Sequence, residues 1–330
     1  MTGRVVVTGG SGFVGSHLAE RLAEQGREVV VYDAAATPPK DRAREPDLVR
    51  YVTGDIRDAD RLAEVITPEV EVVYHLAAVV GVDTYLGRPL DVIDVAFGGT
   101  KAVLERACRT GAKVVMVSTS EIYGKNQVVP WKEDADRVLG STATDRWSYS
   151  SSKALAEHLT FAFMRQHGLR ATILRYFNVY GPRQRPAYLV SRTVHRALRG
   201  LPPVVYDDGR QTRCFTYVAD AVQGTILAGE SPKADGECFN LGSTYEMPIG
   251  HVIEMVSELA GGPAQPVAVE TDRALGNRYQ DMRRRMPDTS KALATLGWRA
   301  STPLEEGLAA VIHWGRRNPW WLELPENGLQ

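Results

Sequence analysis

Tyr149 and Lys153 stand four residues apart in the segment Tyr149-Ser150-Ser151-Ser152-Lys153. Side chains at this spacing share one face of a helix. An ammonium beside a phenol lowers the pKa of the phenol, so Tyr149 can act as a general base near neutral pH. The hydroxyl of Thr119 would hold the substrate's alcohol while its proton leaves. Taken alone, the Tyr/Lys spacing also fits a solvated pair on a helix, so the surrounding elements decide between the two.

A glycine-rich turn lies near the start of the chain. Within Thr8–Gly15, glycines at 9, 12 and 15 form the pattern G-x-x-G-x-x-G between a predicted strand and a predicted helix. Gly9 permits the tight turn, Gly12 lets the backbone approach a diphosphate, and Gly15 lets helix and strand pack closely. The free N–H groups at the helix N-terminus bind phosphate. The turn predicts a dinucleotide site, which also includes Phe13 and Val14.

Asp33 ends the second predicted strand, 18 residues after Gly15. A carboxylate there accepts the adenine ribose hydroxyls and repels a 2′-phosphate. Because Ala34-Ala35-Ala36 offers no arginine for that phosphate, NAD is the predicted cofactor. Further cofactor contacts are expected after the next strands, at Asp55, Ile56, Leu76, Ala77 and Ala78.

Short runs that are apolar at every position alternate with amphipathic stretches. Such runs are typical of strands covered on both faces, so the fold class is α/β, a Rossmann-type doubly wound parallel sheet. Residues 1–180 are predicted to form the cofactor domain, and the proline-rich residues 181–330 a smaller α+β region partly interleaved with it. Strands are expected at Arg4–Thr8, Val29–Tyr32, Val70–His75, Lys113–Ser118 and Thr172–Tyr176, and helices at Ser16–Gln25, Thr100–Thr110 and Ser151–His167.

The composition excludes several functional classes. The chain has 330 residues and a net charge of −1, which argues against a nucleic-acid binder. Cys108, Cys214 and Cys238 are too widely spaced for a disulfide scaffold or a metal site. No apolar run is long enough for a membrane span, and the chain opens directly into a predicted strand. We therefore expect a cytoplasmic protein with no signal peptide, metal or membrane partner.

Several motifs together resemble the extended short-chain dehydrogenase/reductases that modify nucleotide sugars. The resemblance implies tightly bound NAD, recycled in each turnover, and a UDP- or dTDP-sugar held by the C-terminal region. It also implies a homodimer formed through the helices at Thr100–Thr110 and Ser151–His167. One departure is Ala96, where the family often has asparagine. The matching motifs are Thr8–Gly15, Asp33, Gly54-Asp55, His75–Ala78, Ser118–Gly124, Tyr149/Lys153, Arg175-Tyr176-Phe177-Asn178 and Gln211-Thr212-Arg213.

The resemblance also implies roles for individual residues. Thr119, Tyr149 and Lys153 are the implied catalytic residues: Tyr149 takes the proton of the sugar's 4-hydroxyl while hydride leaves C4 for NAD. Tyr149, Lys153 and Tyr176 are expected to contact the cofactor. The implied substrate-binding residues are Thr119, Ser120, Glu121, Tyr149, Asn178, Arg192, Tyr206, Gln211, Arg213 and Arg285.

The fate of the 4-keto sugar separates the subfamilies. Dehydratases carry Thr-Asp-Glu where this chain has Thr119-Ser120-Glu121, and serine cannot supply their acid. UDP-glucuronate decarboxylases show Thr-Ser-Glu, as this chain does. Arginine suits planar carboxylates and phosphates. Arg213 and Arg285 match positions that grip the diphosphate, and Arg192, predicted in the loop before a helix, is expected to bind the C6 carboxylate of a uronate.

These features favour a UDP-uronate 4-epimerase that interconverts UDP-glucuronate and UDP-galacturonate. Ser150-Ser151-Ser152 and the segment Val179–Gln184 resemble bacterial epimerases, and a longer insert found in one decarboxylase is absent. The alternatives are a UDP-glucuronate decarboxylase, a UDP-glucose 4-epimerase and a dehydratase. A non-catalytic NAD-binding scaffold or sensor is disfavoured because Thr119, Tyr149 and Lys153 are all present.

Overall fold

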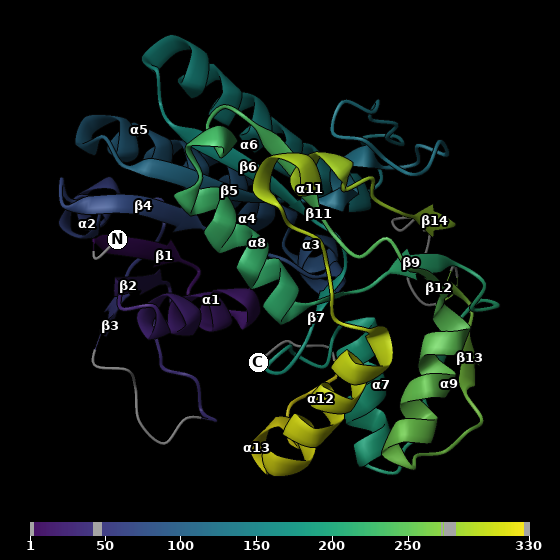
Figure 1. The fold of residues 1–330 in the computed structure, drawn as a ribbon. Helices are drawn as coiled ribbons and strands as arrows, with labels where there is room; N and C mark the ends of the chain where they lie inside the picture. Colours follow the sequence, from purple (N-terminus) through teal and green to yellow (C-terminus); the bar gives the residue numbers. More distant parts are fainter. Residues whose placement is uncertain (1–2, 42–47, 272, 274–281, 327–330) are drawn as a thin grey trace.

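The computed structural model describes residues 3–41, 48–271, 273 and 282–326. Its largest layer is a seven-stranded sheet in the order β11-β6-β5-β4-β1-β2-β3 (Figure 1). All neighbouring strands run parallel, and the order reverses between β1 and β4, where the glycine-rich turn leaves β1. The predicted Rossmann-type sheet is therefore confirmed. Its strands are β1 (Arg4–Thr8), β2 (Glu28–Asp33), β3 (Val49–Thr53), β4 (Val70–His75), β5 (Lys113–Thr119), β6 (Ala171–Tyr176) and β11 (Cys238–Leu241).

Helices cover both faces of this sheet. In β1, Val5 and Val7 pack in the core under one layer of helices, while Val6 packs in the core under the other. This two-sided burial explains why the strand is apolar at every position. The first layer contains α1 (Phe13–Glu24), α8 (Val218–Glu230) and α11 (Ser290–Leu296), and the second contains α2 (Ala59–Val65), α5 (Thr100–Thr110) and α6 (Arg146–His167).

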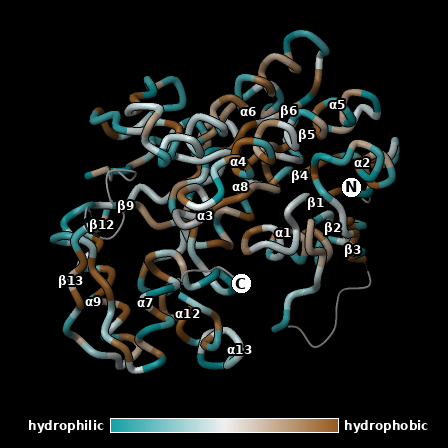
Figure 2. Tube along the Cα trace, turned by 180° about the vertical axis from the view of Figure 1, so that it is seen from behind, coloured by the Kyte–Doolittle hydropathy of each residue, from teal (hydrophilic) through white to brown (hydrophobic). Residues whose placement is uncertain are grey.

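A smaller group of helices lies away from the sheet (Figure 1). Their apolar faces meet in a separate core, and Figure 2 shows hydrophobic stretches recurring along α7, α9 and α12. Two elements from beyond residue 180 belong to the larger region: β11 is a strand of the large sheet, and α8 packs against that sheet. The domain boundary at residue 180 stays a prediction. The helices of the group are α7 (Leu189–Leu198), α9 (Ile249–Ala260), α12 (Leu304–Arg317) and α13 (Pro319–Leu322).

Short strands join the two regions. β9 (Thr212–Cys214) pairs with β12 (Glu246–Pro248) and β14 (Arg284–Arg285) in a three-stranded sheet. None of the helices in the described part of the chain is both long and apolar enough to cross a membrane. The remaining short elements are α3 (Val82–Gly87), α4 (Pro89–Asp94), η1 (Val95–Gly99), η2 (Ser120–Tyr123), β7 (Val179–Tyr180), β8 (Val204–Tyr206), β10 (Thr216–Tyr217), η3 (Pro232–Ala234) and β13 (Val267–Val269).

Candidate active site

Tyr149 lies in the first turn of α6, which begins at Arg146, five residues earlier than the sequence predicts. Its hydroxyl is hydrogen-bonded to the side chain of Thr119, at the end of β5. Burial raises the pKa of Tyr149 above its ordinary value, and the negative charge of Glu121 raises it further, against the effects of Thr119 and Arg285. The structure thus brings the predicted base and its hydroxyl partner together. The prediction that Lys153 lowers the pKa of Tyr149 is wrong for the protein by itself, because burial outweighs the neighbouring positive charges and keeps the phenol neutral. The positive charge of an oxidised nicotinamide would favour its ionisation.

Lys153 follows one helical turn later and is buried. Its Nζ donates a hydrogen bond to the carbonyl oxygen of Val117 at 2.9 Å, which fixes the ammonium against β5. Burial lowers the pKa of Lys153 to about 8, although the nearby carboxylate of Glu157 opposes the shift. The charge on Lys153 therefore titrates close to physiological pH.

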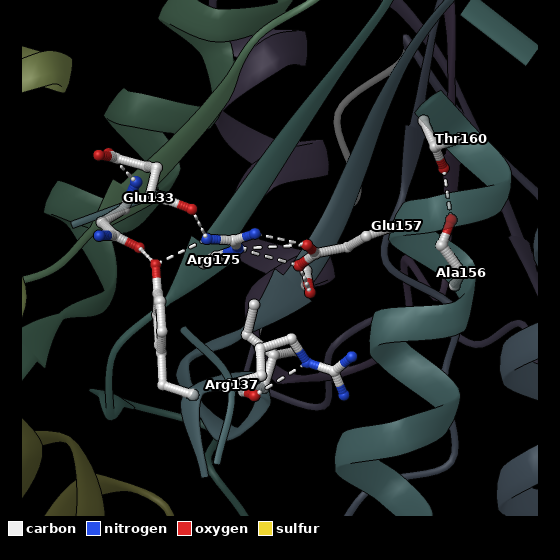
Figure 3. A network of polar contacts seen from close by, with 10 residues as sticks. Glu133, Arg137, Ala156, Glu157, Thr160 and Arg175 are labelled. Atoms are coloured by element: carbon white, nitrogen blue, oxygen red, sulfur yellow. Dashed lines mark hydrogen bonds and ion pairs between the residues drawn. The ribbon is translucent and has the colours of Figure 1, made fainter. Parts of the chain in front are cut away.

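A buried polar network between α6 and strands β5 and β6 holds the helix to the sheet (Figure 3). The carboxylate of Glu157 accepts hydrogen bonds from the Ser118 hydroxyl at 2.5 Å and from Arg175 Nη2 at 2.7 Å. Arg175 also donates to the Tyr123 hydroxyl at 2.7 Å and to the carbonyl oxygen of Glu133 at 2.6 Å. Since Glu157 lies one turn after Lys153 on α6, this network sets both the position and the electrostatic environment of the lysine.

We expect turnover to fall as the pH rises through about 8, because the ammonium of Lys153 is lost there. Glu157→Gln removes the charge that favours the ammonium, so the alkaline fall should move down by about one pH unit. Steady-state rates between pH 6 and 10 measure this shift. Glu133→Gln alters the same network without removing that charge and should leave the profile unmoved; equal profiles for wild type and Glu157→Gln would contradict the assignment.

Glu121 lies beside the Tyr/Lys pair and is held by two arginines. Its carboxylate is 3.0 Å from Arg146 Nη2 and 2.7 Å from Arg285 Nη2. Burial alone would raise the pKa of Glu121, but the charges of Arg146 and Arg285 outweigh it and lower the pKa to about 2. Arg213 acts in the same direction. Glu121 is therefore a carboxylate throughout the physiological range and cannot donate a proton.

Arg285 connects this acidic residue to the predicted substrate residues. Its Nη1 donates to the Ser120 hydroxyl at 3.5 Å and to Asn178 Oδ1 at 3.4 Å, and its buried Nε has no hydrogen-bond partner among the residues that the structure describes. Arg285 is paired in register with Arg213 across β14 and β9. The structure thus brings Ser120, Glu121, Asn178, Arg213 and Arg285 into one cluster.

Arg192 does not lie in a loop, as the sequence predicts, but inside α7. The helix already includes Ser191, whose hydroxyl donates to the carbonyl oxygens of Arg185 and Tyr188. The Arg192 guanidinium stacks over the ring of Tyr206, 5.1 Å from its centroid. Tyr206 itself belongs to strand β8. Gln211 precedes β9, where its carbonyl oxygen accepts the backbone N–H of Ile249.

The backbone geometry of the glycine-rich turn is suited to binding a dinucleotide. Gly9 has a φ of +70°, and a Cβ on Gly15 would lie 2.2 Å from the Gly9 carbonyl oxygen. Gly12 is the N-cap of α1 and supplies no capping side chain, and the first turn carries no acidic residue. The open N–H groups and the positive end of the helix dipole are what a diphosphate requires.

The remaining cofactor residues lie around this turn. Asp33 Oδ2 accepts the backbone N–H of Ser11 at 3.2 Å, so the carboxylate lies over the turn, as a ribose-binding residue must. The backbone N–H of Ala77 approaches the Thr8 hydroxyl at 3.3 Å, which brings Leu76–Ala78 against the same turn. The carboxylate of Asp55 pairs with Arg57 at 2.6 Å. Ile56 is buried in the core, and the Tyr176 hydroxyl is bonded to Thr225.

The chain bends at Ala96, although alanine stands there in place of the family's asparagine. Ala96 lies in η1, one turn of π-helix that leads into α5. The Thr100 hydroxyl donates to the Ala96 carbonyl oxygen at 2.6 Å and contacts His75 Nε2 at 3.1 Å. His75 Nδ1 contacts the Thr8 hydroxyl at 2.8 Å. The bend is thus supported by a buried hydrogen-bond chain without an asparagine.

Arg146 is the alternative to Arg192 that the sequence offers for binding the C6 carboxylate, and in the structure it pairs with Glu121. It lies three residues before Tyr149 and so shares its helix face. The sequence predicts no role for one further residue of the site. Tyr188, at the N-cap of α7, lies close enough to Tyr149 to raise its pKa. No local pattern indicates this contact, because the two tyrosines meet only through the tertiary fold.

The chain matches known proteins over nearly its whole length. The family model described as "NAD dependent epimerase/dehydratase family" matches residues 5–242. A UDP-N-acetyl-alpha-D-glucosaminuronate decarboxylase of Bacillus cytotoxicus is 37% identical over 96% of this chain and 98% of its own. UDP-glucuronic acid decarboxylase 1 of Xenopus tropicalis is 33% identical over 95% of this chain and 72% of its own.

Solved structures give the same picture of the fold. A UDP-glucose 4-epimerase of Thermotoga maritima, solved with UDP-glucose, has a TM-score of 0.86 at 30% identity and covers 96% of this chain and 99% of its own. MoeE5, solved in complex with UDP-glucuronic acid and NAD, has a TM-score of 0.82 at 32% identity, over 96% of this chain and 100% of its own. The similar proteins thus include both decarboxylases and an epimerase.

Proposed function

The chain belongs to the NAD-dependent epimerase/dehydratase family, and we propose that within this family it removes the C6 carboxylate of a UDP-uronate as carbon dioxide. The observation that carries the proposal is Glu121, ionised and held between Arg146 and Arg285 beside Tyr149. The decarboxylases named among the relatives support the same reaction. This reading replaces the 4-epimerase hypothesis favoured by the sequence motifs.

The charge balance of the cluster suits a uronate. Three arginines, Arg146, Arg213 and Arg285, act on the single carboxylate of Glu121, which leaves an excess of two positive charges. A UDP-uronate brings a diphosphate and a C6 carboxylate, whereas a UDP-hexose brings the diphosphate alone. Because guanidinium groups bind both kinds of anion, the excess favours the more acidic substrate.

NAD, when bound, would accept a hydride from C4 of the sugar and later return it. Tyr149 must act here as the phenolate, which the ammonium of Lys153 and the positive charge of oxidised NAD would stabilise. The phenolate takes the O4 proton as hydride leaves C4, so that C4 becomes a ketone and the C6 carboxylate a β-keto acid. The C5–C6 bond then breaks, carbon dioxide leaves, and its electron pair forms an enolate at C4 and C5. C5 takes up one proton, C4 regains hydride, and Tyr149 returns the proton to O4. Each turnover therefore consumes one proton and releases one carbon dioxide.

Decarboxylation also explains why an arginine-bound glutamate suits the site. The carboxylate of the substrate loses its charge when carbon dioxide leaves, so a bare guanidinium on it would stabilise the starting state. Glu121 occupies Arg285 at 2.7 Å and moderates that attraction. Glu121 thus acts as a positioning residue, while Tyr149, Thr119 and Lys153 carry the proton chemistry.

Product analysis tests the proposal. Holoenzyme is incubated separately with UDP-glucuronate and with UDP-N-acetylglucosaminuronate, and the products are followed by proton NMR. Both sugars are tested because each is named as the substrate of one of the similar decarboxylases. A UDP-pentose, as the sugar or its 4-keto form, is the expected product from at least one of them. Formation of the C4 epimer without carbon dioxide would instead establish the epimerase.

A UDP-uronate 4-epimerase is the second candidate. The epimerase-like segment Val179–Gln184 favours it, and so does the structural similarity to the UDP-glucose 4-epimerase of Thermotoga maritima. The oxidation at C4 by Thr119, Tyr149 and Lys153 is the same in both reactions. They differ in whether the C6 carboxylate is retained, which the NMR experiment reads directly.

We propose that the protein forms a homodimer. The family resemblance implies an interface made by α5 and α6, whereas the exposed apolar side chains favour one made by α4, η1 and α6, which pack together. Large apolar side chains remain exposed there: Leu90 is 73% exposed and Leu155 48%. Ile93 and Phe97 extend the same surface at 41% and 37%. A matching face on a second copy would bury all four.

Leu155→Glu should weaken this dimer at least about 100-fold, because a carboxylate in an apolar interface must be desolvated. Sedimentation velocity over a concentration series measures the change. Leu293→Glu on α11, where leucine is 53% exposed, is the matched control and should leave the assembly unaltered. Wild-type protein that sediments as a monomer at all concentrations would refute the proposal.

A further inference from the structure

The loop after β2 is fixed to the glycine-rich turn at its near end. The Ser11 hydroxyl donates to the carbonyl oxygen of Thr37 at 3.0 Å, and the backbone N–H of Thr37 donates back to the same hydroxyl at 2.9 Å. Asp33, at the start of this loop, accepts the backbone N–H of Ser11. The loop thus frames the part of the cofactor site that binds the adenine ribose and diphosphate.

Asp41, the last residue of this loop before the part that the structure does not describe, is fixed to the C-terminal region. Asp41 Oδ2 accepts hydrogen bonds from Arg183 Nε at 2.9 Å and from the indole N–H of Trp314, on α12, at 2.6 Å. Arg183 also pairs with Glu20 of α1 at 2.7 Å and donates to the Ser16 hydroxyl at 3.3 Å. We call Asp41, Arg183, Glu20 and Trp314 the Asp41 cluster.

The Asp41 cluster is largely shielded from water. The side chains of Asp41 and Glu20 are each 10% exposed and that of Arg183 is 12% exposed. Burial alone would raise the pKa of Asp41, but the hydrogen bonds from Arg183 and Trp314 outweigh it and lower the pKa. A charge buried in this way is strongly destabilised when one partner is removed, so the contacts hold the loop firmly.

Aromatic packing extends the contact. The ammonium of Lys40 lies 5.5 Å from the ring centroid of Trp320. Trp320 and Trp321 both pack edge-on against Trp314, with centroids 5.8 Å and 5.4 Å away. In Figure 1 the loop after β2 reaches toward α12 and α13, which carry these rings. Trp320 and Trp321 thus form part of a junction between the two regions.

We propose that the Asp41 cluster, with the Lys40–Trp320 contact, is a latch that retains NAD by keeping the loop after Asp33 ordered. A loop already fixed in its binding conformation pays no ordering cost when the cofactor binds. If the latch is broken, the loop adopts its NAD-binding conformation only part of the time. The apparent affinity for NAD is then reduced in proportion to the fraction of molecules in that conformation. The cluster residues are positioning residues, since they act through Asp33 and the glycine-rich turn.

The affinity for NAD tests the latch. NAD is stripped from each variant and titrated back by calorimetry. Trp314→Phe keeps an aromatic ring but removes one hydrogen bond to a charged group, and the Kd for NAD should rise at least about tenfold. Lys40→Gln on the exposed loop should raise it about threefold. No nucleotide sugar is used, so the result is independent of which reaction the enzyme performs.

Trp321→Phe is the matched control. It removes an indole hydrogen bond to the Gln184 carbonyl oxygen within the same aromatic group but leaves Asp41 untouched, so its Kd should stay within about twofold of wild type. Thermal unfolding of the NAD-free proteins reports whether each variant is folded. If Trp314→Phe does not fold, Asp41→Asn and Lys40→Gln decide. Folded latch variants with wild-type affinity, or an equal loss in Trp321→Phe, would overturn the proposal.

Discussion

Tyr149→Phe is expected to lower kcat about 1,000-fold, because the sugar's 4-hydroxyl loses the group that takes its proton. The variant should keep its fold and its NAD, since it loses only the phenol hydroxyl and that group's hydrogen bond with Thr119. Single-turnover hydride transfer, followed as absorbance at the reduced nicotinamide, is the direct measurement.

Tyr188→Phe provides the matched control, because Tyr188 is the other phenol near this position. It should retain turnover within about tenfold of wild type. If Tyr149→Phe keeps more than a tenth of the wild-type rate and Tyr188→Phe loses it, the base has been assigned to the wrong tyrosine.

Glu121→Gln is expected to reduce kcat for carbon dioxide release about 100-fold without raising KM. The substitution keeps the size of the side chain but removes the charge that occupies Arg146 and Arg285. The freed guanidinium groups would hold the substrate carboxylate more tightly than the transition state, which lowers kcat and KM together. Because the pKa of Glu121 is about 2, loss of a proton donor is not the cause. Initial rates over a range of substrate concentrations separate the two constants.

Glu246→Gln is the control for this experiment. Glu246 pairs at 2.7 Å with Arg284, the neighbour of Arg285 on β14. The substitution should leave kcat and KM near their wild-type values. A Glu121→Gln enzyme with a raised KM and an unchanged kcat would show that Glu121 contributes to binding alone.

The sheet and most of its helices could be predicted because their signals are local. Strand Val70–His75 and helix Thr100–Thr110 have the predicted bounds. The helix stops at its C-cap, Gly111, whose φ is +76°. The start of α6 was predicted too late because its first turns are polar. The hydroxyls of Ser148 and Ser152 donate to the backbone carbonyl oxygens of Asp145 and Ser148, so these polar side chains are accommodated in the first turns of the helix.

The site could be predicted less completely, for a different reason. The motifs supplied Thr119, Tyr149, Lys153 and the glycine-rich turn, which lie on elements whose positions follow from the sheet. The Glu121 cluster depends on Arg146 and Arg285, which lie on distant segments and meet only in the tertiary fold. Arg192 was predicted to bind a carboxylate but stacks on Tyr206. Its part in substrate recognition therefore stays a prediction.

The most direct measurement follows the fate of C6. Holoenzyme is supplied with UDP-glucuronate carrying ¹³C at C6, in deuterated water, and both the gas and the sugar are followed by NMR; the N-acetylated uronate is treated in parallel. Decarboxylation predicts that the label leaves as carbon dioxide and bicarbonate while the sugar product carries one deuteron at C5. A label that remains in a six-carbon uronate, with the configuration at C4 inverted, would contradict the account.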